Sequence, residues 1–411
     1  MTAERFKEAR TILGAVAAGD ELLIVQGRDR RLAAELDEAM AEVCRPQRAE
    51  MGGLVGMLTA YFLNREGLTV GLLERGETCR ESSWAGGGII SPLVPWQYPQ
   101  AVSTLVRWSQ RYYPGLADTL RAQTGIDVEW LQSGLLLLDV PLSRDIREWA
   151  DRNRCALQAV AAAELPELEP AVGEEAAQSV LLPEVAQVRN PRLGAALRRS
   201  LSETGVRIHE HTEVTGFLAS GDRIHGVATA RGEFHAERVV VAGGAWSAPL
   251  LAMLDIGLPV TPVKGQMIQY RATPGLLRHI ILYRNHYLIP RRDGLVLAGS
   301  TLEDTGYDKS TTAAARDELM QKASRLVPAL GKCEVVRHWA GLRPGVSDGV
   351  PFIGPLFGSR TKAASRSETL GMITPTVIEN TSDLRAVSDD IRQEFRKIPP
   401  MDIATLQDEG L

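Results

Sequence analysis

The sequence predicts a mixed α/β fold in which a nucleotide-binding unit is interleaved with an antiparallel sheet. A glycine-rich turn at residues 52–56 opens an amphipathic helical pattern, and a short apolar run at 68–73 follows it. A second apolar run, RVVVAGGAW at 238–246, breaks into glycines as a buried strand does where it meets a ligand. Residues 279–301 alternate in polarity and turn at Asp293-Gly294, which is typical of a hairpin.

Composition favours small-molecule chemistry. The 411 residues are 44% hydrophobic and 24% charged, which is enough for a large core. A net charge of −5 with interspersed acids and bases excludes a basic stripe for nucleic acid or an anionic membrane. Cys44, Cys79, Cys155 and Cys333 lie far apart without a CxxC pair, so we expect neither a zinc site nor a disulfide framework. The first 23 residues lack a long apolar stretch, which predicts no signal peptide and a cytoplasmic location.

The glycine turn and a later glutamate indicate a dinucleotide site. Such a site needs glycines where the backbone approaches a pyrophosphate, beside a helix N-terminus that faces the anion. In the G-x-G-x-x-G frame, Met51 replaces the first glycine, while Gly53 and Gly56 stand as the second and third. Glu74 follows about 20 residues later, where a carboxylate can accept hydrogen bonds from a ribose. An ordinary helix start followed by a surface glutamate is the alternative at this point.

The order of motifs from Gly52 to about Pro355 resembles bacterial glycine oxidases of thiamin synthesis, within the D-amino-acid oxidase family. The most specific stretch is RESSWAGGGIISPLVPWQYP at 80–99. Its hydroxyls can donate to phosphate, and its three glycines let main-chain N–H groups reach a flat ring. The resemblance implies a Rossmann-like FAD-binding domain interleaved with a substrate domain. It also implies FAD contacts at Gly53, Val55, Gly56, Glu74, Arg75, Ser82, Ser83, Gly86, Gly87, Gly88, Ile89, Val214, Ala242 and Gly243.

Two residues carry the substrate chemistry that the resemblance implies. YLIPRRDG places Tyr287 where the family has a tyrosine over the substrate, and HWAGLRPG places Arg343 where it has an arginine for the substrate carboxylate. A guanidinium holds a carboxylate with two N–H groups and so fixes its angle. The alternative interpretations are that Tyr287 is an ordinary aromatic residue of a strand and that Arg343 forms an ion pair on the surface. Tyr283 either lines the same pocket or packs in the core.

The resemblance implies that the chain oxidises glycine or a small N-methyl or D-amino acid. A hydride passes from the α-carbon to FAD, the imine hydrolyses to a 2-oxo acid and ammonia, and oxygen accepts the electrons to give hydrogen peroxide. No protein base is required, so we interpret all seven histidines as structural or solvated. The alternatives are a D-amino-acid or sarcosine oxidase, a dehydrogenase that uses a quinone, and a catalytically defective remnant or fusion product. The sequence leaves open whether the chain forms a homo-oligomer.

Both ends depart from the family pattern. Residues 44–50, CRPQRAE, cannot form the buried strand that should precede the glycine turn, so ELLIVQG at 21–27 is the candidate substitute, with an inserted helix after it. After residue 358 the family's second glycine turn, arginine and long helix are missing, and one amphipathic helix is expected near 384–395. We predict an atypical N-terminal extension (1–50), an FAD-binding domain (51–100, 185–255, 335–358), a substrate domain (101–184, 256–334) and an atypical tail (359–411).

Overall fold

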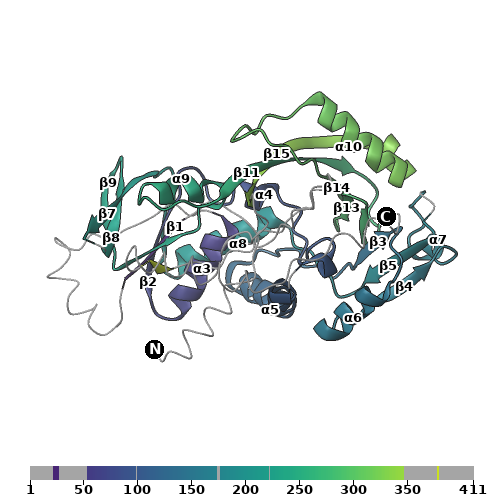
Figure 1. Cartoon of the computed structure of the whole chain (residues 1–411), viewed down its shortest axis with the longest axis horizontal. Coiled ribbons are helices and arrows are strands. Elements are labelled where there is room, and N and C mark those ends of the chain that lie inside the picture. The colour runs from purple at the N-terminus through teal and green to yellow at the C-terminus, as the bar shows by residue number, and fades with distance from the viewer. Residues whose placement is uncertain are drawn as a thin grey trace.

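The structure is a computed structural model that describes residues 22–26, 53–98, 100–173, 176–221, 223–346 and 377–378. The CRPQRAE segment, the helix expected after residue 27 and the helix expected at 384–395 lie outside these residues. Figure 1 shows an elongated molecule, with the predicted nucleotide unit at one end and a large sheet at the other. The mixed α/β fold class is confirmed, with parallel and antiparallel pairing present.

A five-stranded sheet forms the nucleotide unit. Its order is β16-β10-β1-β2-β6. β2 pairs with β6 in parallel, while β1 is antiparallel to both of its neighbours, so that β2 and β10 run in the same direction. Helices α3 and α8 pack together and against this sheet (Figure 1). The bounds are β1 (Leu22–Gln26), β2 (Thr69–Leu73), β6 (Arg207–His209), β10 (Arg238–Val241), β16 (Val377–Ile378), α3 (Leu54–Arg65) and α8 (Asn190–Glu203).

Strand β1 is the candidate substitute from the sequence, and it runs against the family pattern. It fills the position between β10 and β2, which confirms its place in the sheet. A Rossmann unit needs this strand parallel to its neighbours, so that it leads directly into the glycine turn. Here Leu22 pairs with Leu73 and Gln26 pairs with Thr69, so β1 runs antiparallel to β2. The apolar run can pair in this direction because a strand satisfies its backbone hydrogen bonds in either orientation.

The second lobe is an eight-stranded sheet that confirms the predicted hairpins around Asp293-Gly294. All its pairs are antiparallel except β12 with β3. The two longest strands, β11 and β15, pair with each other and reach toward the nucleotide unit (Figure 1). In sheet order the strands are β15 (Glu334–Val346), β11 (Val260–Arg271), β14 (Leu295–Gly299), β13 (His286–Pro290), β12 (Ile280–Tyr283), β3 (Leu135–Leu138), β5 (Gln178–Leu182) and β4 (Gln158–Ala161).

Residues 223–235 form a hairpin that does not join the large sheet. β7 (Val214–Ser220), β8 (Arg223–Thr229) and β9 (Gly232–His235) make a separate three-stranded sheet, whose β8 also contacts β10. The hairpin pattern fixes local pairing but not the sheet that a hairpin joins. The remaining helices are α4 (Ser82–Ala85), α5 (Gln100–Thr124), α6 (Arg144–Asn153), α7 (Leu165–Leu168), α9 (Ser247–Ala252) and α10 (Ala313–Leu326), with 3-10 turns η2 (Pro95–Gln97), η3 (Gly244–Trp246) and η4 (Pro328–Lys332).

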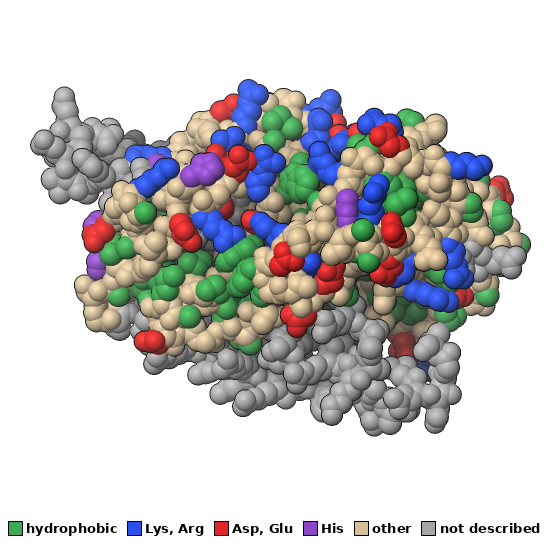
Figure 2. Space-filling view, turned by 90° about the horizontal axis from the view of Figure 1, so that it is seen from above, with side chains coloured by type: hydrophobic (Ala, Val, Ile, Leu, Met, Phe, Trp, Pro, Cys, Tyr) green, Lys and Arg blue, Asp and Glu red, His purple; other side chains and the backbone are tan. Residues whose placement is uncertain are grey.

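The large sheet is covered differently on its two faces. Helix α10 packs on one face, where Ile268, Tyr270 and Leu319 share a core. The opposite face carries Met267 and Tyr287 in another core. No helix in the described part of the chain has the length and apolarity to cross a membrane. Figure 2 shows blue and red side chains intermingled over the face seen from above, as the sequence predicts.

Candidate functional site

The segment that begins with α4 lies on the β11–β15 end of the large sheet. The Trp339 indole N–H donates to the Ala85 carbonyl at 3.1 Å, and the Ser82 hydroxyl donates to the Leu342 carbonyl at 2.5 Å. A β-carbon at Gly341 would lie 2.4 Å from the Ala85 β-carbon. Glycine at 341 therefore permits this close approach, and the segment predicted to contact FAD is fixed against the strand that carries Arg343.

A buried arginine holds the glycines that follow α4. Arg291 lies just after β13, and its guanidinium donates to the Gly87 carbonyl at 2.7 Å, the Val188 carbonyl at 3.0 Å and the Gln187 side-chain oxygen at 2.6 Å. Burial lowers the pKa of Arg291 to about 10, so the group stays charged at neutral pH. Gly88 has φ +73°, and a β-carbon there would lie 2.1 Å from the Val188 carbonyl oxygen. This set of contacts fixes the course of the loop.

Sequence reasoning missed this role of Arg291. The residue stands in the quoted segment YLIPRRDG, one position before the exposed Arg292. Nothing in a pair of adjacent arginines shows which one turns inward. The available signal was the position of Arg291 directly after an apolar strand, two residues after the buried Ile289, a spacing that keeps side chains on one face of a strand.

Tyr287 and Arg343 lie on the same face of the sheet. Arg343 pairs with Val263 on β11, and four residues later Met267 pairs with Gly299, which in turn pairs with Tyr287. Residues paired directly across strands share a face, and so do residues two or four apart on one strand. The structure therefore brings together the two side chains that the resemblance assigns to the substrate.

Each of these two side chains has defined contacts. The Tyr287 hydroxyl contacts the Met267 sulfur at 3.5 Å, and the ring is buried. The Arg343 guanidinium donates to the Ser300 hydroxyl at 2.5 Å and to the Thr301 carbonyl at 3.4 Å. A β-carbon at Gly87 would lie 3.7 Å from the Tyr287 ring, which places the glycine loop beside it. Tyr287 and Arg343 thus lie close to the loop that the sequence assigns to FAD.

Tyr283 does not belong to this group. It pairs with His286, one residue before Tyr287, so its side chain points to the opposite face. There it packs against the core beneath α10. The structure favours the core-packing alternative for Tyr283.

The start of α3 and the end of β2 lie at one edge of the five-stranded sheet, because α3 runs back along β2. Gly53 caps α3 without a side chain, and Val55 and Gly56 are buried in its first turn. The Leu54 N–H donates to the Ser83 hydroxyl at 3.0 Å, which joins α3 to α4. Glu74 ends β2 with only 4% of its surface exposed, and its carboxylate accepts the Gly76 N–H at 2.7 Å.

The other predicted cofactor residues are distributed around this edge. Ala242 and Gly243 follow β10, which runs parallel to β2, so they reach the same edge. Val214 is buried at the start of β7. Arg75 stacks on the Trp246 ring at 3.8 Å, a partner that the sequence did not indicate.

The chemical groups of these residues are the ones that an adenine dinucleotide requires. A helix N-terminus without a capping side chain suits a pyrophosphate, and a buried carboxylate at the end of the next strand suits a ribose. Within the described residues, no cluster of three or more histidine, cysteine or acidic side chains could hold a metal ion. The serine hydroxyls at 82 and 83 already have protein partners. Their contact with phosphate remains a prediction.

Comparison with known proteins identifies the family. A family model described as FAD dependent oxidoreductase (DAO) matches residues 52–374. The chain belongs to this family. FAD is therefore its cofactor, and the residues at the edge of the five-stranded sheet are the candidates to hold it. The members of this family are described as oxidoreductases, which confirms the prediction from the sequence that the chain is an oxidoreductase.

Curated relatives and solved structures cover most of the chain. It is 47% identical over 307 residues to a glycine oxidase of Pseudomonas aeruginosa, with 74% of this chain and 84% of the relative covered. A glycine oxidase of Geobacillus kaustophilus is 31% identical, with 74% and 82% covered. Among solved structures, the glycine oxidase from Bacillus cereus has a TM-score of 0.67 and 29% identity, and covers 74% of this chain and 84% of its own.

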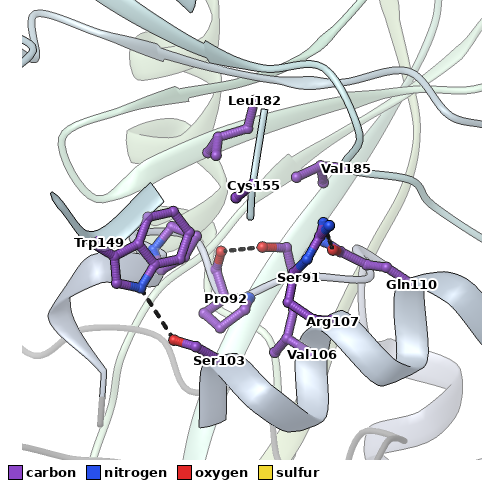
Figure 3. A pocket seen from close by; sticks show the side chains of 11 residues that line it. Ser91, Pro92, Ser103, Val106, Arg107, Gln110, Trp149, Cys155, Leu182 and Val185 are labelled. Atoms are coloured by element: carbon purple, nitrogen blue, oxygen red, sulfur yellow. Dashed lines mark hydrogen bonds between the residues drawn. The ribbon is translucent and has the colours of Figure 1, made fainter. Parts of the chain in front are cut away.

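A small pocket lies elsewhere, between α5, α6 and β5 (Figure 3). Its polar side chains are engaged within the protein: the Trp149 indole donates to the Ser103 hydroxyl at 3.1 Å, and the Ser91 hydroxyl donates to the Pro92 carbonyl at 2.9 Å. Burial raises the pKa of Cys155 to about 11, which keeps this thiol protonated and unreactive. Arg107 also lines the pocket, but its guanidinium pairs with Glu184. The pocket therefore offers neither a reactive group nor an unpaired charge for a ligand, and we do not assign the functional site to it.

Proposed function

We propose that the chain oxidises glycine or a similarly small amino acid, with oxygen as the electron acceptor. The observation that carries the proposal is the placement of Arg343 and Tyr287 on one sheet face, beside the glycine loop. The glycine oxidases among the relatives support the choice of substrate. The named FAD-contacting residues and the domain boundaries predicted from the sequence belong to the same proposal. A cytoplasmic location stays a prediction of the sequence.

Arg343 is proposed to bind the substrate carboxylate. Its two terminal nitrogens are already oriented by Ser300 and Thr301, so the guanidinium plane is fixed before a substrate arrives. Two parallel N–H donors then set both the position and the angle of the carboxylate. Fixing the substrate in this way lowers the entropic part of the barrier, which is the main contribution that a protein makes beside a reactive cofactor.

FAD would be held by the residues at the edge of the five-stranded sheet and by the glycine loop, and when bound it would supply the two-electron redox chemistry that links amino-acid oxidation to the reduction of oxygen to hydrogen peroxide. Around it, Tyr287 covers the substrate and the glycine loop excludes side chains from the reacting face. The substrate amine must be unprotonated for its lone pair to support the loss of hydride. The imine then leaves the site and hydrolyses to the 2-oxo acid and ammonia.

The first test is the absorption spectrum of the purified protein. A yellow protein whose flavin band bleaches when glycine is added without oxygen supports the proposal, and hydrogen peroxide must appear when oxygen is restored. D-alanine, sarcosine and a quinone-like dye, tested in parallel, separate the related oxidases and the dehydrogenase. Colourless protein that takes up no added FAD would instead support a catalytically defective remnant.

The second test addresses Arg343. We expect Arg343→Lys and Arg343→Ala to keep FAD and to raise KM for glycine by roughly 100-fold, since a charge-assisted hydrogen bond contributes about 1.5–3 kcal/mol and each 1.4 kcal/mol is a factor of ten. Lysine should recover little, because it keeps the charge without the two-pronged geometry. Unchanged KM in both variants would remove Arg343 from the site.

A further inference from the structure

The guanidinium of Arg343 lies flat against a residue that has no side chain. A β-carbon at Gly265 would be 2.1 Å from Nη1 of Arg343 and 2.6 Å from both Cζ and Nη2. Gly265 does not have a positive φ, so its backbone conformation would accept any residue. The three atoms nearest to this β-carbon position all belong to the Arg343 guanidinium, so the guanidinium is the group that a side chain here would meet first.

The strand register explains this contact. Arg343 pairs with Val263 on β11, and Gly265 is the next residue of β11 on the same face. The arginine side chain therefore leans diagonally along the neighbouring strand, a direction that long side chains can reach. Its far side is held by Ser300 and Thr301, which follow β14. The guanidinium is thus confined between the bare backbone of β11 and the two acceptors that follow β14.

We propose that Gly265 is a positioning residue for the substrate carboxylate, because its missing side chain forms the slot in which the Arg343 guanidinium lies. The inference rests on the proposed function. A β-carbon would push the guanidinium away from the sheet by more than an ångström, since ordinary van der Waals contact requires at least about 3.4 Å. A displacement of that size at an orienting group can slow a reaction about 100-fold.

The experiment compares Gly265→Ala with Gly257→Ala. Gly257 lies shortly before β11, and no atom lies within 4 Å of its β-carbon position, so this variant serves as the matched control. We expect Gly265→Ala to bind FAD normally in a fluorescence titration. KM for glycine should rise at least about tenfold, with a smaller change in kcat. The Kd for acetate, read from the perturbed flavin spectrum, should rise in the same proportion. Gly257→Ala should match the wild type in all three measurements.

A double variant tests whether Gly265 acts through Arg343. When Arg343→Ala has already removed the guanidinium, adding Gly265→Ala should change neither KM nor the acetate Kd further. Additive effects of the two substitutions would overturn the proposal, and so would a Gly265→Ala enzyme that binds acetate like the wild type. If Arg343→Ala itself leaves acetate binding unchanged, the proposed function fails at its first step. That outcome differs from a failure confined to Gly265.

The double variant also covers the case in which Gly265→Ala does not fold. The clash disappears with the guanidinium, so the double variant should regain the thermal stability of Arg343→Ala alone. A double variant that stays unfolded would show that Gly265 is needed for another reason, and the proposal would be wrong.

Discussion

Replacing Arg291 by methionine tests how firmly the glycine loop is held. Methionine keeps the length and apolar stem of the side chain but removes the three hydrogen bonds to residues 87, 187 and 188. The Gly87 and Val188 carbonyls and the Gln187 side-chain oxygen then lose a donor in a buried place. Because Gly87 belongs to the loop assigned to FAD, we expect both the fold and cofactor binding to weaken.

The size of the expected loss of stability in Arg291→Met follows from these hydrogen bonds. Each buried acceptor left without a donor costs about 1–3 kcal/mol, and the released cost of burying the charge offsets part of this sum. The groups left behind are neutral oxygens rather than an unpaired charge, so the net cost should lie near the lower end of the sum over three acceptors, at about 3–5 kcal/mol. At about 2–4 °C per kcal/mol for a large domain, Tm should fall by roughly 6–20 °C. The Kd for FAD should rise at least about tenfold, since 1.4 kcal/mol of this loss at the loop is sufficient.

Arg292 provides the matched control. It is the next residue and also an arginine, but it is half-exposed, and it donates to the Trp130 carbonyl at 2.6 Å and to Asp127 at 3.4 Å. Exposed contacts of this kind contribute about 0–1 kcal/mol, so Arg292→Met should lower Tm by no more than about 4 °C and leave FAD binding unchanged. Tm is read by circular dichroism of the apoprotein, and Kd by flavin fluorescence. Equal effects of the two substitutions would refute the assignment of Arg291 as the residue that holds the loop.

Three further predictions concern stability. Burial lowers the pKa of His286 from 6.5 to about 4, so the unfolded chain binds a proton between these values and the folded chain does not; stability should fall as pH drops from 6.5 to 4. Between pH 7 and pH 5, the Tm of His286→Leu should therefore fall by less than the Tm of the wild type. An equal fall in both proteins would contradict the reasoning. Gly194→Ala should destabilise by about 1–3 kcal/mol in chemical denaturation, because a β-carbon there would lie 2.2 Å from the Cys79 sulfur. Gly115→Ala, in open space on α5, should instead stabilise by about 0.5–1 kcal/mol.

Local pattern predicted much of this fold from the sequence. The apolar run at 68–73 and the hairpin at Asp293-Gly294 each appear where the sequence places them. Period and turn chemistry decide such elements within a few residues of chain. The meeting of Tyr287 and Arg343 followed from the resemblance, because their strands are separated by α10 in the sequence and no local pattern joins them.

What the sequence did not predict depends on packing across strands. Gly265 stands inside a strand between Lys264 and Gln266, and a glycine within a strand is a general sign of close approach, but its partner is set by register with β15. The inward turn of Arg291 depends on carbonyl groups about 100 and 200 residues away. The direction of β1 cannot be predicted from its own residues, since an apolar run satisfies its backbone groups in either orientation.

The reversed β1 has a consequence for the integrity of the protein. β10 and β2 do not pair with each other; each pairs with β1, so the sheet contains a gap one strand wide that a separate piece of chain fills. Without that piece, two facing rows of unpaired N–H and C=O groups would lie about 10 Å apart, twice the usual strand spacing. Such a gap accepts an added strand of either polarity from another molecule, as in donor-strand complementation. Proteolytic loss of residues 22–26 would therefore turn this enzyme into an acceptor for foreign strands and a starting point for aggregation.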